Sequence, residues 1–382
     1  MHELQRAPAL GVLVSEWGRI GAIGFGGPPT HIALLRKLCV EQRGWLSPAE
    51  FEDAIAACNL LPGPASTQLA IYCAWRLRGR LGGLAGGLAF ILPGFVAILA
   101  LAAIFLANSP PLWIRGAAAG AGAGVAAVAV QAGLSLVPAS RSRARSRLRW
   151  IVYGILGGLA AATIGPWLVL VLAACGLVEI AATTRPPGSS VSLLPLGAAV
   201  AVPVGGLAAL TWVAFKVGAL SYGGGFVIVP LMQHDAVVHD HWMTNGQFLN
   251  AVALGQVTPG PVTHTVAAVG YAAAGVGGAL LATAVAFSPS FLFVLLGGRH
   301  FRALRENAVA RSFLGGAGPA AIGAILGAAV PLARALGTWW QFVLLVIAAC
   351  LLLVLRRGVV PTLLALGVVG ALLAAFHAVA IS

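Results

Sequence analysis

Long apolar segments dominate this chain and constrain its fold more than any other feature. Most of them reach about 20 residues, the length at which an α-helix crosses the hydrocarbon core of a bilayer. With 59% hydrophobic and 9% charged residues, a chain of 382 residues has too little polar surface to cover a soluble globule. A membrane β-barrel would need alternation over about ten residues per strand, which is absent. We therefore predict an all-α polytopic membrane protein, with apolar segments at 81–106, 112–137, 150–182, 193–215, 279–297, 313–332, 339–355 and 359–381.

The formal net charge of +13 does not indicate a nucleic-acid-binding protein. The arginines stand in short loops between the apolar segments, where the positive-inside rule places them. The five cysteines show no Cys-x-x-Cys spacing, so neither a disulfide framework nor a metal site is indicated. The first 11 residues lack the pattern of a removable signal peptide, and no nucleotide-binding or HExxH motif occurs. We expect no cofactor and no enzymatic activity, and any energy that the protein uses would have to come from an ion gradient or from its partner's own gradient.

The second half of the chain repeats the first at an offset of 197 residues. The repeat is clearest in a Pro-Gly-Pro element at 62–64 that recurs at 259–261. Without a gap, the same offset pairs Gly21 with Gly218, Trp45 with Trp242 and Phe51 with Phe248. Two copies of one structural unit are the expected result.

Basic residues change sides between the two copies. The loop after the first Gly-Gly pair carries Arg36, Lys37 and Arg43, whereas its counterpart carries histidines and aspartates. The three arginines between 76 and 80 correspond to a segment of Ala and Gly, and the bias reverses one helix later. Because cytoplasmic loops collect Lys and Arg, the two copies are predicted to be inverted relative to each other in the membrane.

Each Pro-Gly-Pro element lies in an apolar segment that is too short for two crossings. Residues 51–75 span only 25 positions between basic flanks, which predicts a re-entrant helical hairpin with Pro-Gly-Pro at its tip. The repeat predicts a second hairpin over 248–272 that enters from the opposite face. Each repeat is expected to contain one broken helix, one such hairpin and about four further transmembrane helices.

The repeat also sets the expected domain boundaries. We assign residues 1–185 to the N-terminal repeat and 212–382 to the C-terminal repeat. Residues 186–211 are interpreted as a linker, and its apolar segment 193–210 has no place in the five-crossing unit.

Helix N-termini that follow the Pro-Gly-Pro elements are suited to bind an anion, because free N–H groups and the positive end of the helix dipole point toward it. Two such termini that enter from opposite faces would form an oxyanion site. Hydroxyl and amide groups can satisfy tetrahedral oxygens, although Ser and Thr also cap helices with no further role. The candidate residues are Asn59, Gly63, Ser66, Thr67 and Gln68 in the first copy and Gln256, Gly260, Thr263, His264 and Thr265 in the second.

Two cations occupy equivalent positions in the two copies. Arg19 and Lys216 each stand six residues before an aromatic-Gly-Gly sequence. Charges inside a membrane span are functional candidates, so this pair is predicted to complement a dianion; the alternative is that one or both extend to the interface. The following glycines would let the backbone approach the anion, or would simply allow close helix packing: Gly26, Gly27, Gly223 and Gly224.

Proton coupling would require a titratable group near the site. His264 is one candidate. The others are Glu50, Glu52 and Asp53 at the foot of the first hairpin, where a solvated helix start also explains them. His31 is interpreted as a structural or interfacial histidine.

Several longer motifs are specific enough to compare with known families. They are Phe25-Gly26-Gly27-Pro28, Gly44-Trp45-Leu46-Ser47 and Asn59-Leu60-Leu61-Pro62-Gly63-Pro64, followed by Tyr222-Gly223-Gly224-Gly225 and Leu254-Gly255-Gln256-Val257-Thr258-Pro259-Gly260-Pro261. Over almost its whole length the chain resembles the chromate ion transporter family, in its long-chain, two-domain form. The loop 233–242 departs from the family pattern, because it is rich in His and Asp where relatives more often carry Glu and Arg.

The resemblance implies a multi-pass protein of the bacterial inner membrane that exports chromate, driven by the proton gradient, and so confers chromate resistance. Chromate and sulfate share charge, shape and nearly the same size, so a sulfate or other oxyanion importer stays open as an alternative. A membrane-bound chromate reductase is a weaker alternative, because the sequence offers no ligand set for a flavin, haem or metal. The expected partners are chromate or sulfate, protons and the lipid bilayer, with no nucleic acid; a homodimer is an open alternative to a monomer.

Overall fold

The computed structural model describes residues 8–61, 63–107, 109–163, 167–183, 205–221, 225–298 and 301–376, and these ranges contain helices and no strand. The first half contains α1 (Leu10–Ile23), α2 (Pro28–Arg36), the π-helix η1 (Lys37–Gln42), α3 (Pro48–Cys58), α4 (Ala65–Phe105), α5 (Leu112–Ala123), α6 (Val125–Ser142), α7 (Arg147–Thr163) and α8 (Leu168–Thr183). The second half contains α9 (Gly206–Leu220), α10 (Ile228–Gln233), the π-helix η3 (His234–His239), α11 (Asn245–Val257), the 3-10 helix η4 (Val262–His264), α12 (Thr265–Gly297), α13 (Phe301–Glu306), α14 (Ala308–Gly327), α15 (Ala329–Arg334), α16 (Trp339–Ala349), the π-helix η6 (Cys350–Val354) and α17 (Val359–Ala375).

The outer surface of α4 shows why these helices require a lipid environment. Leu81, Leu84, Leu88, Leu92 and Val96 recur every three or four residues, and each is 44–66% exposed. A continuous apolar stripe of this kind is typical of a surface that faces lipid rather than water. Within the described residues, four helical segments are long and apolar enough to span a membrane: Ala65–Phe105, Leu112–Ser142, Val262–Gly297 and Ala308–Arg334. The prediction of an all-α polytopic membrane protein is confirmed.

Unusual backbone features recur between the two halves at the offset of the sequence repeat. The π-helix Lys37–Gln42 has its counterpart in His234–His239. Ser47 accepts a hydrogen bond from the N–H of Glu50 at the start of α3, and Thr244 accepts one from the N–H of Gln247 at the start of α11. The duplicated sequence therefore folds twice into the same local structure. The inverted orientation of the two copies stays a prediction.

The first Pro-Gly-Pro element joins two short helical segments. The 11 residues of α3 rise about 16 Å, far less than the ~30 Å of a hydrocarbon core. The helix that follows, α4, is bent at Arg78 and Gly79, where the backbone leaves helical geometry, so its residues 65–77 form a second short segment. In the second half, α12 is bent in the same way at Ala274 and Gly275. These lengths match the expected hairpins, whose re-entrance stays a prediction.

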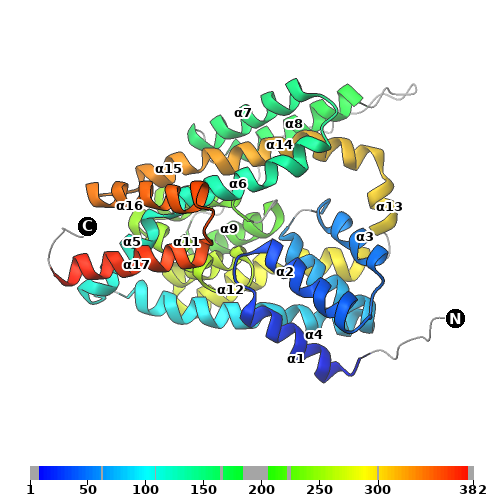
Figure 1. Cartoon of the computed structure of the whole chain (residues 1–382), viewed down its shortest axis with the longest axis horizontal. Helices are drawn as coiled ribbons and strands as arrows, with labels where there is room; N and C mark the ends of the chain where they lie inside the picture. The colour runs from blue at the N-terminus through cyan, green and yellow to red at the C-terminus, as the bar shows by residue number, and fades with distance from the viewer. Residues whose placement is uncertain are drawn as a thin grey trace.

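The two halves of the chain interlock. In Figure 1, the orange helix α14 of the second half lies along the green helices α7 and α8 of the first half. Conversely, α5 of the first half packs against α17. Small residues at these contacts let helix backbones approach closely, and a Cβ atom on Gly323 would overlap the carbonyl oxygen of Gly154. The predicted repeats, 1–185 and 212–382, are therefore not separate bodies in space, because helices of each half pack against helices of the other.

The apolar segment 193–210 lies mostly outside the described residues. Its last five residues belong to α9 (Gly206–Leu220), which occupies the place of α1 (Leu10–Ile23) in the repeat. The second copy thus includes residues 206–211, which the sequence analysis assigned to the linker 186–211. The reason is that α9 begins at Gly206, before the first residues that match the first copy.

We expect Gly323→Ala to destabilise the protein. The added methyl group would meet the backbone of α7, and overpacking of this kind costs about 1–3 kcal/mol. Thermal unfolding of the purified protein in detergent, followed by tryptophan fluorescence, measures the change. Gly277→Ala in α12 is the matched control, because a Cβ atom there meets nothing within 4 Å. Equal unfolding temperatures for the two variants would contradict the packing argument.

Single cysteines test the predicted inversion of the hairpins. Ala49 and Gly246 are exposed, equivalent in the repeat, and lie in the first turns of α3 and α11. With the exposed Cys350 replaced by serine, Ala49→Cys should react with a membrane-impermeant maleimide from the cytoplasmic side and Gly246→Cys from the other side. Reaction of both from one side would contradict the inverted arrangement.

Candidate functional site

Each Pro-Gly-Pro element ends one helix and starts another. Proline cannot donate the hydrogen bond that a continuing helix needs. Gly63 has a φ of 119° between α3 and α4, and Gly260 has a φ of 92° between α11 and η4. Positive φ values are readily accessible to glycine alone, so both chain reversals depend on this residue.

The first hairpin tip lies against helices of the second half. A Cβ atom on Gly63 would come 2.6 Å from Gln68 Nε2 and 3.2 Å from Ser290 Oγ of α12. The carbonyl oxygen of Gly218, in α9, lies 3.4 Å from the same position. The tip of the first hairpin therefore contacts the C-terminal end of α9 and the segment of α12 that follows its bend, and both helices belong to the other repeat.

The second hairpin tip makes the equivalent contact with the first half. A Cβ atom on Gly94 of α4 would overlap the carbonyl oxygen of Pro259 and come 2.8 Å from His264 Nδ1. The N–H of Gly260 donates a 3.0 Å hydrogen bond to the carbonyl oxygen of Gly24. Gly94 and Ser290 hold equivalent positions in the repeat. Each hairpin tip therefore contacts the same position of the long helix in the other half.

Polar side chains are buried at both tips. Six of the predicted site residues have exposed fractions of 0–1%: Ser66, Thr67, Gln68, Thr263, His264 and Thr265. Several of them contact other groups of the protein: Ser66 Oγ lies 3.2 Å from His31 Nδ1, Thr263 Oγ1 lies 3.4 Å from Ser221 Oγ, and Thr265 donates to the carbonyl oxygen of Val262 at 2.8 Å.

Other buried polar atoms have no partner. Within the described residues, nothing meets hydrogen-bond geometry with Thr67 Oγ1, Ser290 Oγ or either ring nitrogen of His264. All three side chains are 0% exposed. Leaving such a group unsatisfied costs about 1–3 kcal/mol, and Thr67 and His264 hold the same position in the repeat. A small polar ligand between the tips would satisfy these atoms.

The sequence analysis missed three residues of this region. Ser290 and Ser221 were not singled out, and His31 was interpreted as structural or interfacial. His31 is in fact fully buried, with Nε2 2.8 Å from the carbonyl oxygen of Gly24 and Nδ1 facing Ser66. The sequence did hold a signal for Ser290: the repeat aligns Pro289-Ser290 of the second copy with Pro93-Gly94 of the first. No local signal linked His31 to Ser66, because 35 residues separate them.

The two predicted cations are already paired with carboxylates. Lys216 Nζ lies 2.5 Å from Asp235 Oδ2 and 5.8 Å from the centre of the Trp212 ring. The side chain of Arg19 is 57% exposed and forms a 2.8 Å ion pair with Glu16. Neither cation contacts the buried tips through a hydrogen bond or ion pair within the described part of the chain.

The remaining predicted residues within the described ranges lie at or next to helix ends. Gly27 precedes α2 and its Cβ position lies 3.9 Å from Val262, while Gly26 beside it is exposed. Gly223 and Gly224 lie outside the described residues. Gln256 is 8% exposed at the end of α11, and Asn59 is half-buried at the end of α3.

Comparison with known proteins gives consistent similarities. The family described as chromate transporter matches residues 12–180 and again 208–375. The chromate transport protein of Cupriavidus metallidurans is 32% identical over 84% of this chain and 82% of its own length. A probable chromate transport protein of Synechococcus elongatus is 31% identical over 86% of both chains, and the chromate transport protein of Pseudomonas aeruginosa is 30% identical over 84% and 80%. No solved structure matches.

We expect Thr67→Val not to destabilise the unliganded protein, because the substitution removes an unsatisfied buried hydroxyl. The gain in the free energy of unfolding would be at most about 3 kcal/mol. The thermal unfolding midpoint in detergent tests this expectation. The control is Thr362→Val in α17, a buried threonine whose hydroxyl donates to the carbonyl oxygen of Gly358 at 2.8 Å. A larger loss of stability at Thr67 than at Thr362 would show that the Thr67 hydroxyl has a partner inside the protein.

Proposed function

This chain belongs to the chromate transporter family, and from that premise we propose that it is a secondary transporter that moves chromate out of the cell across the bacterial inner membrane. The multi-pass helical fold suits this role, since discontinuous helices in other transporters hold the substrate near the middle of the membrane. Removal of chromate from the cytoplasm would confer chromate resistance.

One observation carries the proposal for the site. The tips of the two hairpins present buried hydroxyl and imidazole groups. Within the described residues, hydrogen-bond geometry is not met by Thr67 Oγ1, by the ring nitrogens of His264, or by Ser290 Oγ of α12 beside the first tip. Chromate is a tetrahedral dianion whose oxygens accept hydrogen bonds. Hydroxyls, N–H groups and the first turns of α4 and α12 would supply donors without a charge at each oxygen.

The same chemistry predicts weak discrimination between chromate and sulfate. Both are tetrahedral dianions of nearly the same size, and donors of this type bind oxygen rather than the central atom. A site of this kind distinguishes such ligands poorly, so we expect sulfate to compete.

We assign the coupling proton to His264. This imidazole is buried beside Gly94, at a position where an anion would lie close to it. The carboxylates at the foot of the first hairpin are paired with arginines instead, Glu50 with Arg76 and Glu52 with Arg36. For export driven by the inward proton gradient, His264 would bind the anion as a neutral N–H donor, take up a proton at the outer face once the anion has left, and return that proton to the cytoplasm before the next anion binds.

Transport into everted membrane vesicles tests the function. Vesicles energised by respiration should accumulate chromate, an uncoupler should collapse the accumulation, and excess sulfate should compete. Uptake of sulfate or chromate in right-side-out vesicles only would make the protein an importer. Loss of chromate absorbance without accumulation would instead indicate a reductase.

Variants in the same vesicles test the site. Thr67→Val and His264→Asn should lower transport roughly 10–100-fold, because a hydrogen bond to a charged group contributes about 1.5–3 kcal/mol. Thr362→Val should transport like the wild type. Arg19→Ala and Lys216→Ala are measured alongside, and normal transport by either variant would remove that residue from the proposed site.

A further inference from the structure

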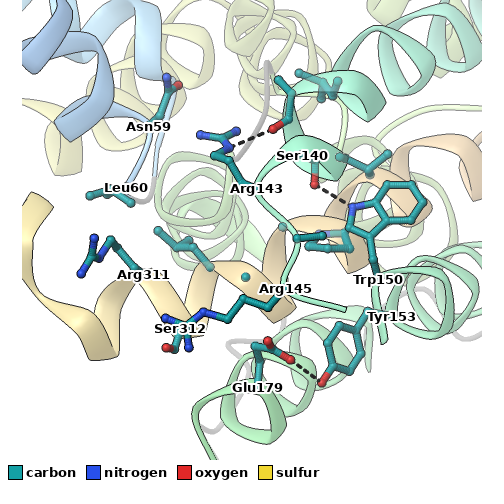
Figure 2. A pocket seen from close by; sticks show the side chains of 18 of the residues that line it. Asn59, Leu60, Ser140, Arg143, Arg145, Trp150, Tyr153, Glu179, Arg311 and Ser312 are labelled. Carbon is teal, nitrogen blue, oxygen red and sulfur yellow. Dashed lines mark hydrogen bonds between the residues drawn. The ribbon is translucent and has the colours of Figure 1, made fainter. Parts of the chain in front are cut away.

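A cavity of about 620 Å³ lies beside the first hairpin and apart from the second. Figure 2 shows its two sides, with Asn59 and Leu60 of the hairpin facing the end of α6, the start of α7 and the start of α14. The buried Gly63 of the hairpin tip also lines this cavity. The cavity therefore runs from the surface to the region of the candidate site.

Four arginines line this cavity. Arg143 and Arg145 come from the segment between α6 and α7, Arg149 comes from the first turn of α7, and Arg311 comes from α14, more than 160 residues later. Figure 2 shows Arg143, Arg145 and Arg311 around this cavity, with their guanidinium groups apart from one another. Tertiary packing, rather than sequence proximity, concentrates these positive charges.

One carboxylate opposes them. Glu179 is 5% exposed, lies 3.0 Å from Arg149 Nε and accepts a 3.1 Å hydrogen bond from the hydroxyl of Tyr153. Among the described residues, no carboxylate forms an ion pair with Arg143, Arg145 or Arg311, and the guanidinium of Arg143 donates to the carbonyl oxygen of Ala139 at 2.9 Å. The lining therefore carries a net excess of three positive charges.

We propose that this cavity is a capture site that draws tetrahedral oxyanions toward the first hairpin before they reach the buried tips. The proposal rests on the proposed transport function. Clefts lined by charge of one sign focus the electrostatic field and raise the local concentration of the oppositely charged ligand. Since basic loops collect in the cytoplasm, the cavity faces the side from which an exporter takes its substrate.

The geometry favours brief rather than tight binding. Arg143, Arg145 and Arg311 are exposed, so water screens them, while Glu179 competes with an incoming anion for Arg149. Conduction requires binding that is favourable enough to gather the ion and weak enough to release it. The phosphate of an anionic lipid headgroup is, like chromate, a tetrahedral oxyanion group. The test must therefore distinguish binding of chromate from binding of anionic lipid.

Trp150 provides a local probe. Its indole lines the cavity and donates to Ser140 Oγ at 3.0 Å. Chromate absorbs where tryptophan emits, so bound chromate quenches Trp150, and subtraction of the Trp150→Phe signal isolates that residue. The titration uses purified full-length protein, in detergent and in phosphatidylcholine liposomes at low ionic strength.

We expect the triple variant Arg143→Gln, Arg145→Gln, Arg311→Gln to weaken quenching of Trp150 by chromate on the order of tenfold, and to raise the transport KM similarly with little change in maximal rate. The matched control is Arg141→Gln with Arg147→Gln, since these exposed arginines flank the same loop, at the end of α6 and the start of α7, but do not line the cavity. The control should behave as the wild type.

Three outcomes would overturn the proposal. They are unchanged quenching and KM in the triple variant, an equal loss in the control, and a Trp150 signal that responds to phosphatidylglycerol liposomes but not to chromate. Failure of the transport function is distinct from these. In that case wild-type liposomes would accumulate neither chromate nor sulfate, although chromate would still quench Trp150 through the arginines.

Discussion

The structure depends on one constraint: a helix that is interrupted inside an apolar environment loses hydrogen bonds that water cannot replace. In hydrocarbon, each backbone N–H and C=O must find a partner within the protein. Each Pro-Gly-Pro element interrupts the helical hydrogen bonds, and the N–H of Gly260 finds its partner in the carbonyl oxygen of Gly24, in the other half of the chain. Beside the tips, Thr67 Oγ1 and Ser290 Oγ meet no hydrogen-bond partner among the described residues, and under the proposed function an anion would use them.

Glycine determines where the broken helices meet. Close approach of α9 and α12 at Gly218, and of α1 and α4 at Gly21, leaves no room for a side chain. Each hairpin tip then contacts the bent helix of the opposite repeat, Gly63 beside Ser290 and His264 beside Gly94. The candidate site consequently belongs to neither half alone, and any movement of one half relative to the other would reshape it.

Much of the local structure could be predicted from the sequence. The Pro-Gly-Pro elements, the repeat and the apolar segments predicted the helix breaks at Gly63 and Gly260, and the buried residues Ser66, Thr67, Thr263 and His264 follow those breaks as expected. The cations Arg19 and Lys216 show the limit of this reasoning. Their equivalence in the repeat predicted a shared role, but the structure gives each a carboxylate partner, because Glu16 and Asp235 come close only through helix geometry and folding.

The sequence by itself determined the membrane class, the duplication, the positions at which helices end, and the family, because these depend on local composition and on motifs a few residues long. Only the tertiary structure decided which distant groups share a site. It brought His31 within hydrogen-bond distance of Ser66, Ser290 beside the first hairpin tip, and Arg311 into the lining of the same cavity as Arg143. The physical reason is that helix packing sets these distances through contacts between α4, α12 and α14 and their neighbours, and no pattern within one segment encodes the packing of another.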